Sequence, residues 1–178
     1  MLIQPLPLSV QLSTSGFMPF TGSSNLLLGL AMTVVAVKRL EMDITLIWVV
    51  TFVLHLVATT AILIGRTYLF SSLAFLAPVA AEEISSTVIE GSWLLGTFSL
   101  SGMPSSIQIL LITILPEGLM SWFPTLSLLG RPPLGLPGYY PIIFALLVSL
   151  TAGYIFRKGL KYYVQKGSNR YVPYGFRR

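Results

Sequence analysis

This chain of 178 residues is 54% hydrophobic and only 10% charged, with a formal net charge of +5. An average soluble domain carries about 25% charged residues, so the composition excludes that class and predicts an all-α integral membrane protein that forms one membrane domain. The sequence contains no cysteine, which excludes disulfide bonds and thiolate metal sites.

The N-terminal segment, residues 1–16, reads MLIQPLPLSVQLSTSG. It has no basic region ahead of an apolar run, and therefore it does not resemble a secretory signal peptide. Residues 17–102 are expected to follow with three membrane spans.

A membrane-spanning helix needs about 20 mostly apolar residues. Residues 23–37 predict a first span, which is short unless it borrows from the residues before it. Residues 44–64 are uncharged and predict the clearest span. The apolar stretch 67–81 is too short for a comfortable span, and we expect it to continue the second helix past Arg66 along the membrane surface.

Two further spans are predicted, which gives about four in total. Residues 84–102 are long enough for a span, although they contain Glu90. The last span is predicted at residues 139–156, where tyrosines stand at both ends as in an aromatic belt.

Between these two spans, residues 103–138 contain short apolar runs interrupted by Pro116, Glu117, Gly118 and Pro124. Proline removes a backbone donor and breaks a continuous helix. Broken backbone at membrane depth is tolerated where protein or water surrounds it, so we expect a re-entrant helical hairpin before the last span. The Pro- and Gly-rich stretch 130–138 is expected to be a non-helical connector.

The C-terminal tail, residues 157–178, contains seven basic residues and no acidic one. By the positive-inside rule, the tail is cytoplasmic, and four spans place both termini on that side. Lys38 and Arg39 would then lie outside, which counts against this orientation. The tail also alternates basic and aromatic residues as nucleic-acid binders do, but it begins at a membrane boundary, so we expect contact with lipid headgroups and no nucleic-acid partner.

Ionisable residues inside a predicted span are costly and usually face a bundle interior or water. Glu90 is therefore a candidate for the substrate pathway, a partner of Arg66, or a residue near a helix end. Glu117 is either a pathway residue or a solvated residue at the turn of the hairpin. Glu82 and Glu83 are expected at a solvated cytoplasmic boundary or at a contact with a partner protein.

His55 is the only histidine, and we expect it to be neutral and hydrogen-bonded to a neighbouring helix. A lone histidine without further ligands at helical spacing does not form a known type of metal site, so no metal site is predicted. The sequence also has no catalytic triad, paired carboxylate motif or phosphate-binding loop. We therefore expect neither catalytic residues nor a directly bound cofactor.

Several motifs follow one another from residue 99 to residue 170. A proline-bounded segment leads to an apolar stretch that ends in proline, then an aromatic-Pro pair before Leu-Leu-Gly, and a basic-basic-Gly-Leu-basic-x-Tyr signature follows the last span. The motif residues are Pro104, Leu115, Pro116, Trp122, Phe123, Pro124, Leu128, Leu129, Gly130, Arg157, Lys158, Gly159, Leu160, Lys161, Tyr162 and Tyr163. This order resembles the C-terminal part of bacterial ABC transporter permeases of the exporter type, in the branch with six spans per subunit.

The resemblance extends to the start of the chain, where QPLPLSVQL stands in the place of a cytoplasmic Arg-Pro-Leu turn, with glutamine instead of the arginine. It implies that residues Gln4, Pro5, Leu6, Pro7 and Leu8 form a segment that couples to an ATPase, the alternative being a frayed terminus. Aligned in this way, the chain corresponds to the last two-thirds of a family member, without its first two spans.

The resemblance implies a permease subunit in the inner membrane of a bacterium, which forms part of the pathway of an ATP-driven exporter. Its partners would be an ABC ATPase subunit, which binds the ATP, and a second permease copy or homologue. The alternative is a small, non-transporting subunit of a larger membrane complex that retains the permease fold.

Overall fold

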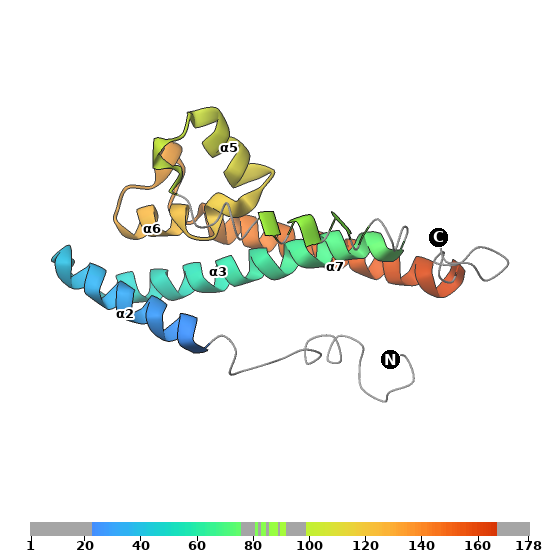
Figure 1. Cartoon of the computed structure of the whole chain (residues 1–178), viewed down its shortest axis with the longest axis horizontal. Coiled ribbons are helices and arrows are strands. Elements are labelled where there is room, and N and C mark those ends of the chain that lie inside the picture. Colours follow the sequence, from blue (N-terminus) through green and yellow to red (C-terminus); the bar gives the residue numbers. More distant parts are fainter. Residues whose placement is uncertain are drawn as a thin grey trace. The chain divides into compact units, whose positions relative to one another are not determined.

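The computed structural model describes residues 23–75, 81, 83, 84, 86–88, 90, 91 and 99–166. All regular secondary structure within these residues is helical (Figure 1), in agreement with the predicted all-α class. The chain divides into two compact units, residues 1–44 and residues 45–178, and each is considered by itself.

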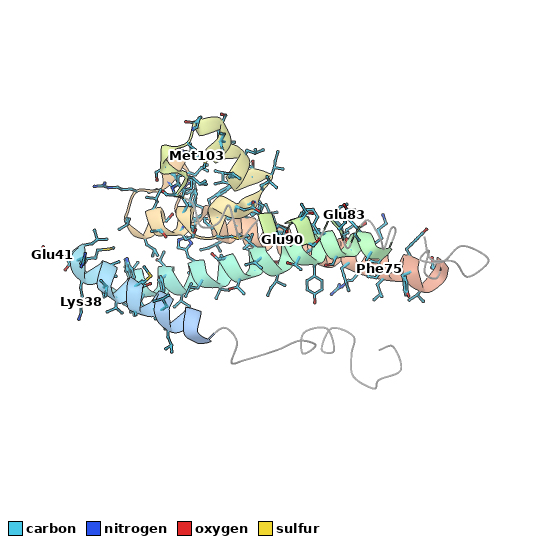
Figure 2. The ribbon with its side chains drawn as sticks, viewed as in Figure 1. Lys38, Glu41, Phe75, Glu83, Glu90 and Met103 are labelled. Atoms are coloured by element: carbon cyan, nitrogen blue, oxygen red, sulfur yellow. The ribbon has the colours of Figure 1, made fainter. Side chains whose placement is uncertain are left out.

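In the first unit, α2 (Ser23–Arg39) coincides with the first predicted span and continues two residues beyond it. The helix ends with Glu41 in the left-handed conformation, at φ 49°. The amides of Glu41 and Met42 then donate to the carbonyls of Lys38 and Val37, which is the Schellman pattern that satisfies the last carbonyls of a helix. Figure 2 labels Lys38 and Glu41 at this end.

In the second unit, α3 (Leu46–Ser71) begins at Thr45, whose hydroxyl accepts a hydrogen bond from the Trp48 amide. The chain continues into the 3-10 turn η1 (Ser72–Phe75). Together they form a 30-residue apolar helix that is long enough to cross a membrane. The prediction that the second helix continues past Arg66 is therefore confirmed as far as Phe75.

The last helix, α7 (Tyr140–Lys166), is also long and apolar enough to cross a membrane. It continues ten residues beyond the predicted end of the span at residue 156, so residues 157–166 of the predicted tail are helical, and their cytoplasmic location remains a prediction. The extension contains no proline, and its Tyr163 packs against Phe75, which stabilises a helical conformation.

Helices α3 and α7 pack side by side and run parallel (Figure 1). Gly65 approaches Val148 near the middle of the pair, and further along both helices Phe75 approaches Gly159. Because contacts advance in the same direction on both helices, their N-terminal ends lie at the same end of the pair. If both helices span the membrane, the chain between them must cross it an odd number of times.

Between these helices lies a folded segment of short helical elements joined by sharp turns. In chain order these are η2 (Leu100–Gly102), α5 (Ser105–Thr113), η3 (Pro116–Leu119), α6 (Trp122–Leu128) and η4 (Pro133–Gly135). The chain bends by 78° between Ser105–Thr113 and Pro116–Leu128, so the predicted break at Pro116 is confirmed. We call residues 105–128 the broken helix. Re-entry into the membrane remains a prediction.

The predicted span at residues 84–102 is described only in part. Residues 83, 84, 86–88, 90 and 91 are helical, whereas residues 92–98 lie outside the described part of the chain. Residues 99–102 form no α-helix, so the prediction of a helix as far as residue 102 was wrong, because the chain turns there towards Pro104. The described residues contain two candidate spans, or three if the broken helix is one span; four spans remain a prediction.

The core of the second unit lies between α3, the broken helix and the first part of α7. Its most deeply buried side chains are those of Ile62, Leu100, Ile112, Leu119 and Phe123. Where this apolar surface would otherwise contact water, its burial stabilises the fold by about 25 cal/mol per Å². Within the membrane the gain is one of close packing.

Candidate functional site

A buried ion pair joins α3 to the turn of the broken helix. The Arg66 guanidinium donates through Nη1 to Oε1 of Glu117. The two side chains are 7% and 4% exposed. Buried charges are tolerated when they are paired and hydrogen-bonded. This contact therefore holds the turn of the broken helix against α3 at the position of Arg66.

The local sequence explains how Glu117 reaches this position. Leu115, which precedes a proline, is extended at φ −109° and ψ 93°, as expected for a residue before proline. Pro116 then starts η3, where its missing N–H removes no helical hydrogen bond. The chain turns sharply enough for Glu117 in this first turn to face α3.

Gly118 completes the turn because no larger residue fits. A Cβ atom there would lie 2.8 Å from Leu100 Cδ1, 2.9 Å from the Leu111 carbonyl oxygen and 3.0 Å from Ile112 Cγ2. The carbonyl belongs to the backbone and cannot rotate away. Three consecutive residues therefore build the turn: Pro116 breaks the helix, Glu117 pairs with Arg66, and Gly118 allows the close approach to Leu111.

Side-chain hydrogen bonds hold the rest of the broken helix against its surroundings. They run from Thr59 Oγ1 to Met120 O (3.2 Å), from Gln108 Nε2 to Leu100 O (3.0 Å) and Met103 O (2.9 Å), from Trp122 Nε1 to Ser101 Oγ (2.9 Å), and from Tyr140 Oη to Ile112 O (3.3 Å). Figure 2 labels Met103, which lies between η2 and α5. The segment is therefore tied to both long helices.

These contacts correct two of the expectations for the acidic residues. Glu117 is buried, so its interpretation as a solvated turn residue was wrong. Arg66 pairs with Glu117, whereas Glu90 is exposed, so the suggested pairing of Glu90 with Arg66 was also wrong. The reason is the bend, which folds a residue 51 positions along the chain onto α3. A pathway role for either glutamate remains a prediction.

His55 is buried, with 2% of its surface exposed. Within the described part of the chain, neither ring nitrogen has a hydrogen-bond partner, so the predicted hydrogen bond to a neighbouring helix was wrong. Four residues later on α3, the Thr59 hydroxyl donates a hydrogen bond to the Met120 carbonyl of the broken helix.

The basic signature after the last predicted span has a packing role that the sequence analysis missed. A Cβ at Gly159 would lie 2.4 Å from Cδ2 of Phe75, so only glycine lets this ring lie against α7. The ring also contacts Phe156 and Tyr163, at centroid distances of 5.3 and 6.0 Å. In the sequence, Gly159 and Tyr163 were the signal that could have indicated a packed helix face in this part of the chain.

The charged members of the signature lie on the other faces of the helix. Arg157, Lys158 and Lys161 are exposed, whereas Leu160 and Tyr162 are half-buried. The signature therefore combines an aromatic docking face for Phe75 with a basic surface.

The remaining motif residues shape the broken helix. Pro104 precedes α5, and Pro124 lies within the first turn of α6, where proline is tolerated. Phe123 is fully buried in the core. Gly130 has φ 71° and ends α6 in a Schellman motif, with the amides of Gly130 and Arg131 donating to the carbonyls of Ser127 and Leu126.

Several candidate residues lie outside the described part of the chain. These are the proposed coupling residues Gln4, Pro5, Leu6, Pro7 and Leu8, together with Glu82 and the tail beyond Lys166. Glu83 is described and exposed. Within the residues that are described, no three His, Asp or Glu side chains come together as potential metal ligands.

Comparison with known proteins gives one match. The family model described as "ABC-2 family transporter protein" matches residues 1–167, which includes the N-terminal segment, the broken helix and the whole of α7. No curated protein matches, and no solved structure matches.

Proposed function

The chain belongs to the ABC-2 family of transporter proteins, and from this premise we propose that it is the permease subunit of an ATP-driven exporter. The family match, which extends over residues 1–167, carries the proposal. In this function the chain forms part of a substrate pathway through the membrane, and a separate subunit binds and hydrolyses ATP.

The two long helices support a membrane-spanning role. The apolar stretches Leu46–Phe75 and Tyr140–Gln165 are each long enough to cross a bilayer, whose hydrocarbon core is about 30 Å thick. In the proposed orientation, the basic residues at the end of α7 lie at the cytoplasmic face of a bacterial inner membrane, as the positive-inside rule requires. Both termini are then cytoplasmic.

The ion pair gives the proposed pathway a defined element. Arg66 and Glu117 fix the turn of the broken helix to α3, and intramembrane ionisable residues commonly mark pathways. We propose that the broken helix forms a re-entrant hairpin, with Glu117 at its tip. Glu90 is a second candidate for the pathway, on a described helical turn where it is exposed.

The partner of this subunit is an ABC ATPase, together with a second permease copy or homologue. Coupling takes place at the cytoplasmic face, where closure of the ATPase on ATP changes the access of the pathway. The N-terminal residues from Gln4 to Leu8 are the proposed contact segment. The described Glu83, which is exposed, is a further candidate for this contact.

The proposal is tested by isolating the intact complex in a mild detergent through a tag on this chain and identifying every co-purified protein by mass spectrometry. We expect an ATPase subunit with a Walker loop in near-equal amount. The purified complex should hydrolyse ATP. Replacement of the lysine in that Walker loop should abolish hydrolysis while the two subunits remain associated.

The opposite outcome is equally informative. Recovery of another large membrane complex without an ATPase subunit would overturn the transporter function. It would favour the alternative, a small non-transporting subunit that retains the permease fold.

A further inference from the structure

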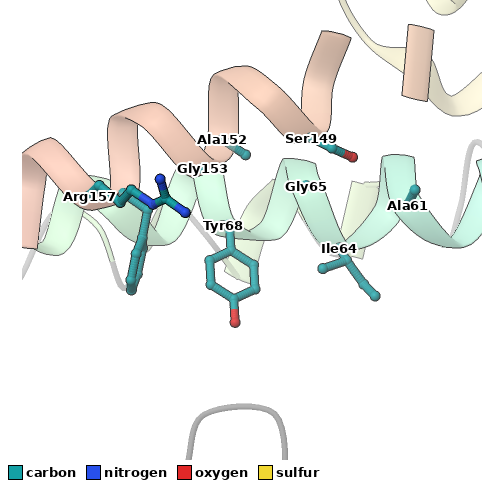
Figure 3. Close-up of a pocket in the computed structure, with 9 residues that line it drawn as sticks. Ala61, Ile64, Gly65, Tyr68, Ser149, Ala152, Gly153 and Arg157 are labelled. Carbon is teal, nitrogen blue, oxygen red and sulfur yellow. The ribbon is translucent and has the colours of Figure 1, made fainter. Parts of the chain in front are cut away.

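A groove of about 420 Å³ runs along the surface between α3 and α7 (Figure 3). Its lining includes small residues, chiefly Gly65 on α3 and Ala152 and Gly153 on α7. A Cβ at Gly153 would meet nothing within 4 Å, so the space beside this residue is open. The lining is mainly apolar, which fits a hydrocarbon chain.

One end of the groove is bounded by aromatic rings and a cation. The rings of Tyr68 and Phe156 meet edge to face at a centroid distance of 5.1 Å, and Arg157 follows directly on α7 (Figure 3). Arg157 is exposed and forms no ion pair among the described residues. Helix α7 contains no acidic residue that could neutralise it.

The length of the groove matches one leaflet of a bilayer. The lining residues on α7 extend from Ser149 to Arg157, which corresponds to about 12 Å at about 1.5 Å per residue. Half of the hydrocarbon core is about 15 Å thick. An acyl chain that lies in the groove therefore places its headgroup close to Arg157.

We propose that this groove is a binding site for an anionic phospholipid, with one acyl chain between α3 and α7 and the phosphate on Arg157. The inference uses the orientation given under the proposed function, in which Arg157 lies at the cytoplasmic face. That leaflet is rich in anionic lipids, which attract basic side chains near its surface. Charge complementarity thus selects an anionic lipid over a zwitterionic one.

The site can be tested on the full-length protein, with or without its partners. The protein is reconstituted in nanodiscs of equal parts phosphatidylglycerol and phosphatidylcholine and released into the mass spectrometer, where retained lipids are counted. We expect wild type to retain phosphatidylglycerol in preference to phosphatidylcholine. Arg157→Gln should reduce this preference about fivefold, because it removes the cation that contacts the phosphate of the lipid in the groove.

Two further variants separate the groove from general surface charge. Lys161→Gln removes an equal charge from an exposed position outside the groove, and it should keep the wild-type preference. Gly153→Leu adds a side chain at a position where a Cβ meets nothing within 4 Å, and it should lower retention of both lipids by occupying the groove.

Three results would overturn the site: equal effects of Arg157→Gln and Lys161→Gln, unchanged lipid retention in Gly153→Leu, or loss of a dimer in Gly153→Leu with lipid retention intact. The last result would assign the groove to a second copy of the chain. Because retained lipid is counted whether or not an ATPase is present, a failure of the exporter function does not affect this test.

Discussion

Arg66 on α3 and Glu117 in the first turn of η3 form an ion pair that is buried on both sides. The contact joins two parts of the chain that are 51 residues apart, and it lies where the broken helix changes direction. A buried pair adds less stability than its Coulomb attraction suggests, because both charges must be desolvated. Loss of one partner, however, removes this attraction while the other charge stays buried.

We therefore expect Arg66→Met and Glu117→Leu, each alone, to lower the free energy of unfolding by about 3–5 kcal/mol. The double variant should recover much of this loss because neither charge of the pair then remains buried. Denaturant titration in detergent, followed by tryptophan fluorescence, measures these differences. Arg131→Met, which removes an exposed arginine, is the matched control and should unfold as wild type does. A single variant as stable as wild type would show that the ion pair does not hold the broken helix.

The turn also depends on the absence of a side chain at Gly118. Gly118→Ala places a methyl group 2.9 Å from the Leu111 carbonyl oxygen, and overpacking of this kind costs about 1–3 kcal/mol. Gly102→Ala is the control, because a Cβ there meets nothing within 4 Å. Thermal unfolding of both variants in the same detergent measures the difference. Equal melting temperatures for the two variants would contradict the close packing at the turn.

The sequence was sufficient to predict the elements that depend on local composition. Apolar length located α3 and α7, and Pro116 located the break between the two short helices. The predicted span ends at residue 156 because a basic run after an apolar stretch marks a membrane boundary, whereas the helix itself continues to Lys166 because no residue stops it. The positive charge of residues 157–166 could be seen in the sequence, but the point at which the helix ends could not.

The contacts of the site could not be predicted in the same way. Glu117 was singled out for its charge, but its partner depends on the 78° bend and on which face of α3 meets it. His55 illustrates the same limit: its burial followed from its place in an apolar run, whereas its lack of a hydrogen-bond partner among the described residues depends on neighbouring segments. Such long-range pairings are set by packing, which a single sequence does not encode locally.

Gly159 and Phe75 provide a test of the docking between η1 and α7. Gly159→Ala would place a methyl group 2.4 Å from the Phe75 ring and force this ring away from Phe156 and Tyr163. We expect a loss of about 1–3 kcal/mol from overpacking, partly offset by the better helix propensity of alanine, which is worth up to about 1 kcal/mol. Amide hydrogen exchange at residues 70–75, measured by mass spectrometry, should become faster.

A second substitution and a control make this test specific. Phe75→Leu combined with Gly159→Ala removes the clash, and it should restore part of the protection from exchange. Gly153→Ala changes a glycine of the same helix where a Cβ has open space, and it should leave exchange at residues 70–75 unchanged. Faster exchange in this control would mean that α7 responds to any substitution and that the ring contact is not the cause.

The parallel packing of α3 and α7 makes a prediction about membrane topology. Asp43 precedes α3, Tyr139 precedes α7, and Val164 lies near the end of α7; all three are exposed. If both helices span the membrane, Asp43 and Tyr139 lie on one side and Val164 on the other. The absence of native cysteine makes single-cysteine variants at these positions free of background labelling.

With the basic end of α7 in the cytoplasm, a membrane-impermeant maleimide should label Asp43→Cys and Tyr139→Cys in cells whose outer barrier is permeabilised. It should label Val164→Cys only after the inner membrane is opened. Labelling of all three from the cytoplasmic side would mean that α7 does not span the membrane. Labelling of Asp43→Cys and Tyr139→Cys from opposite sides would mean an even number of crossings between the two helices, which their parallel packing excludes when both span the bilayer.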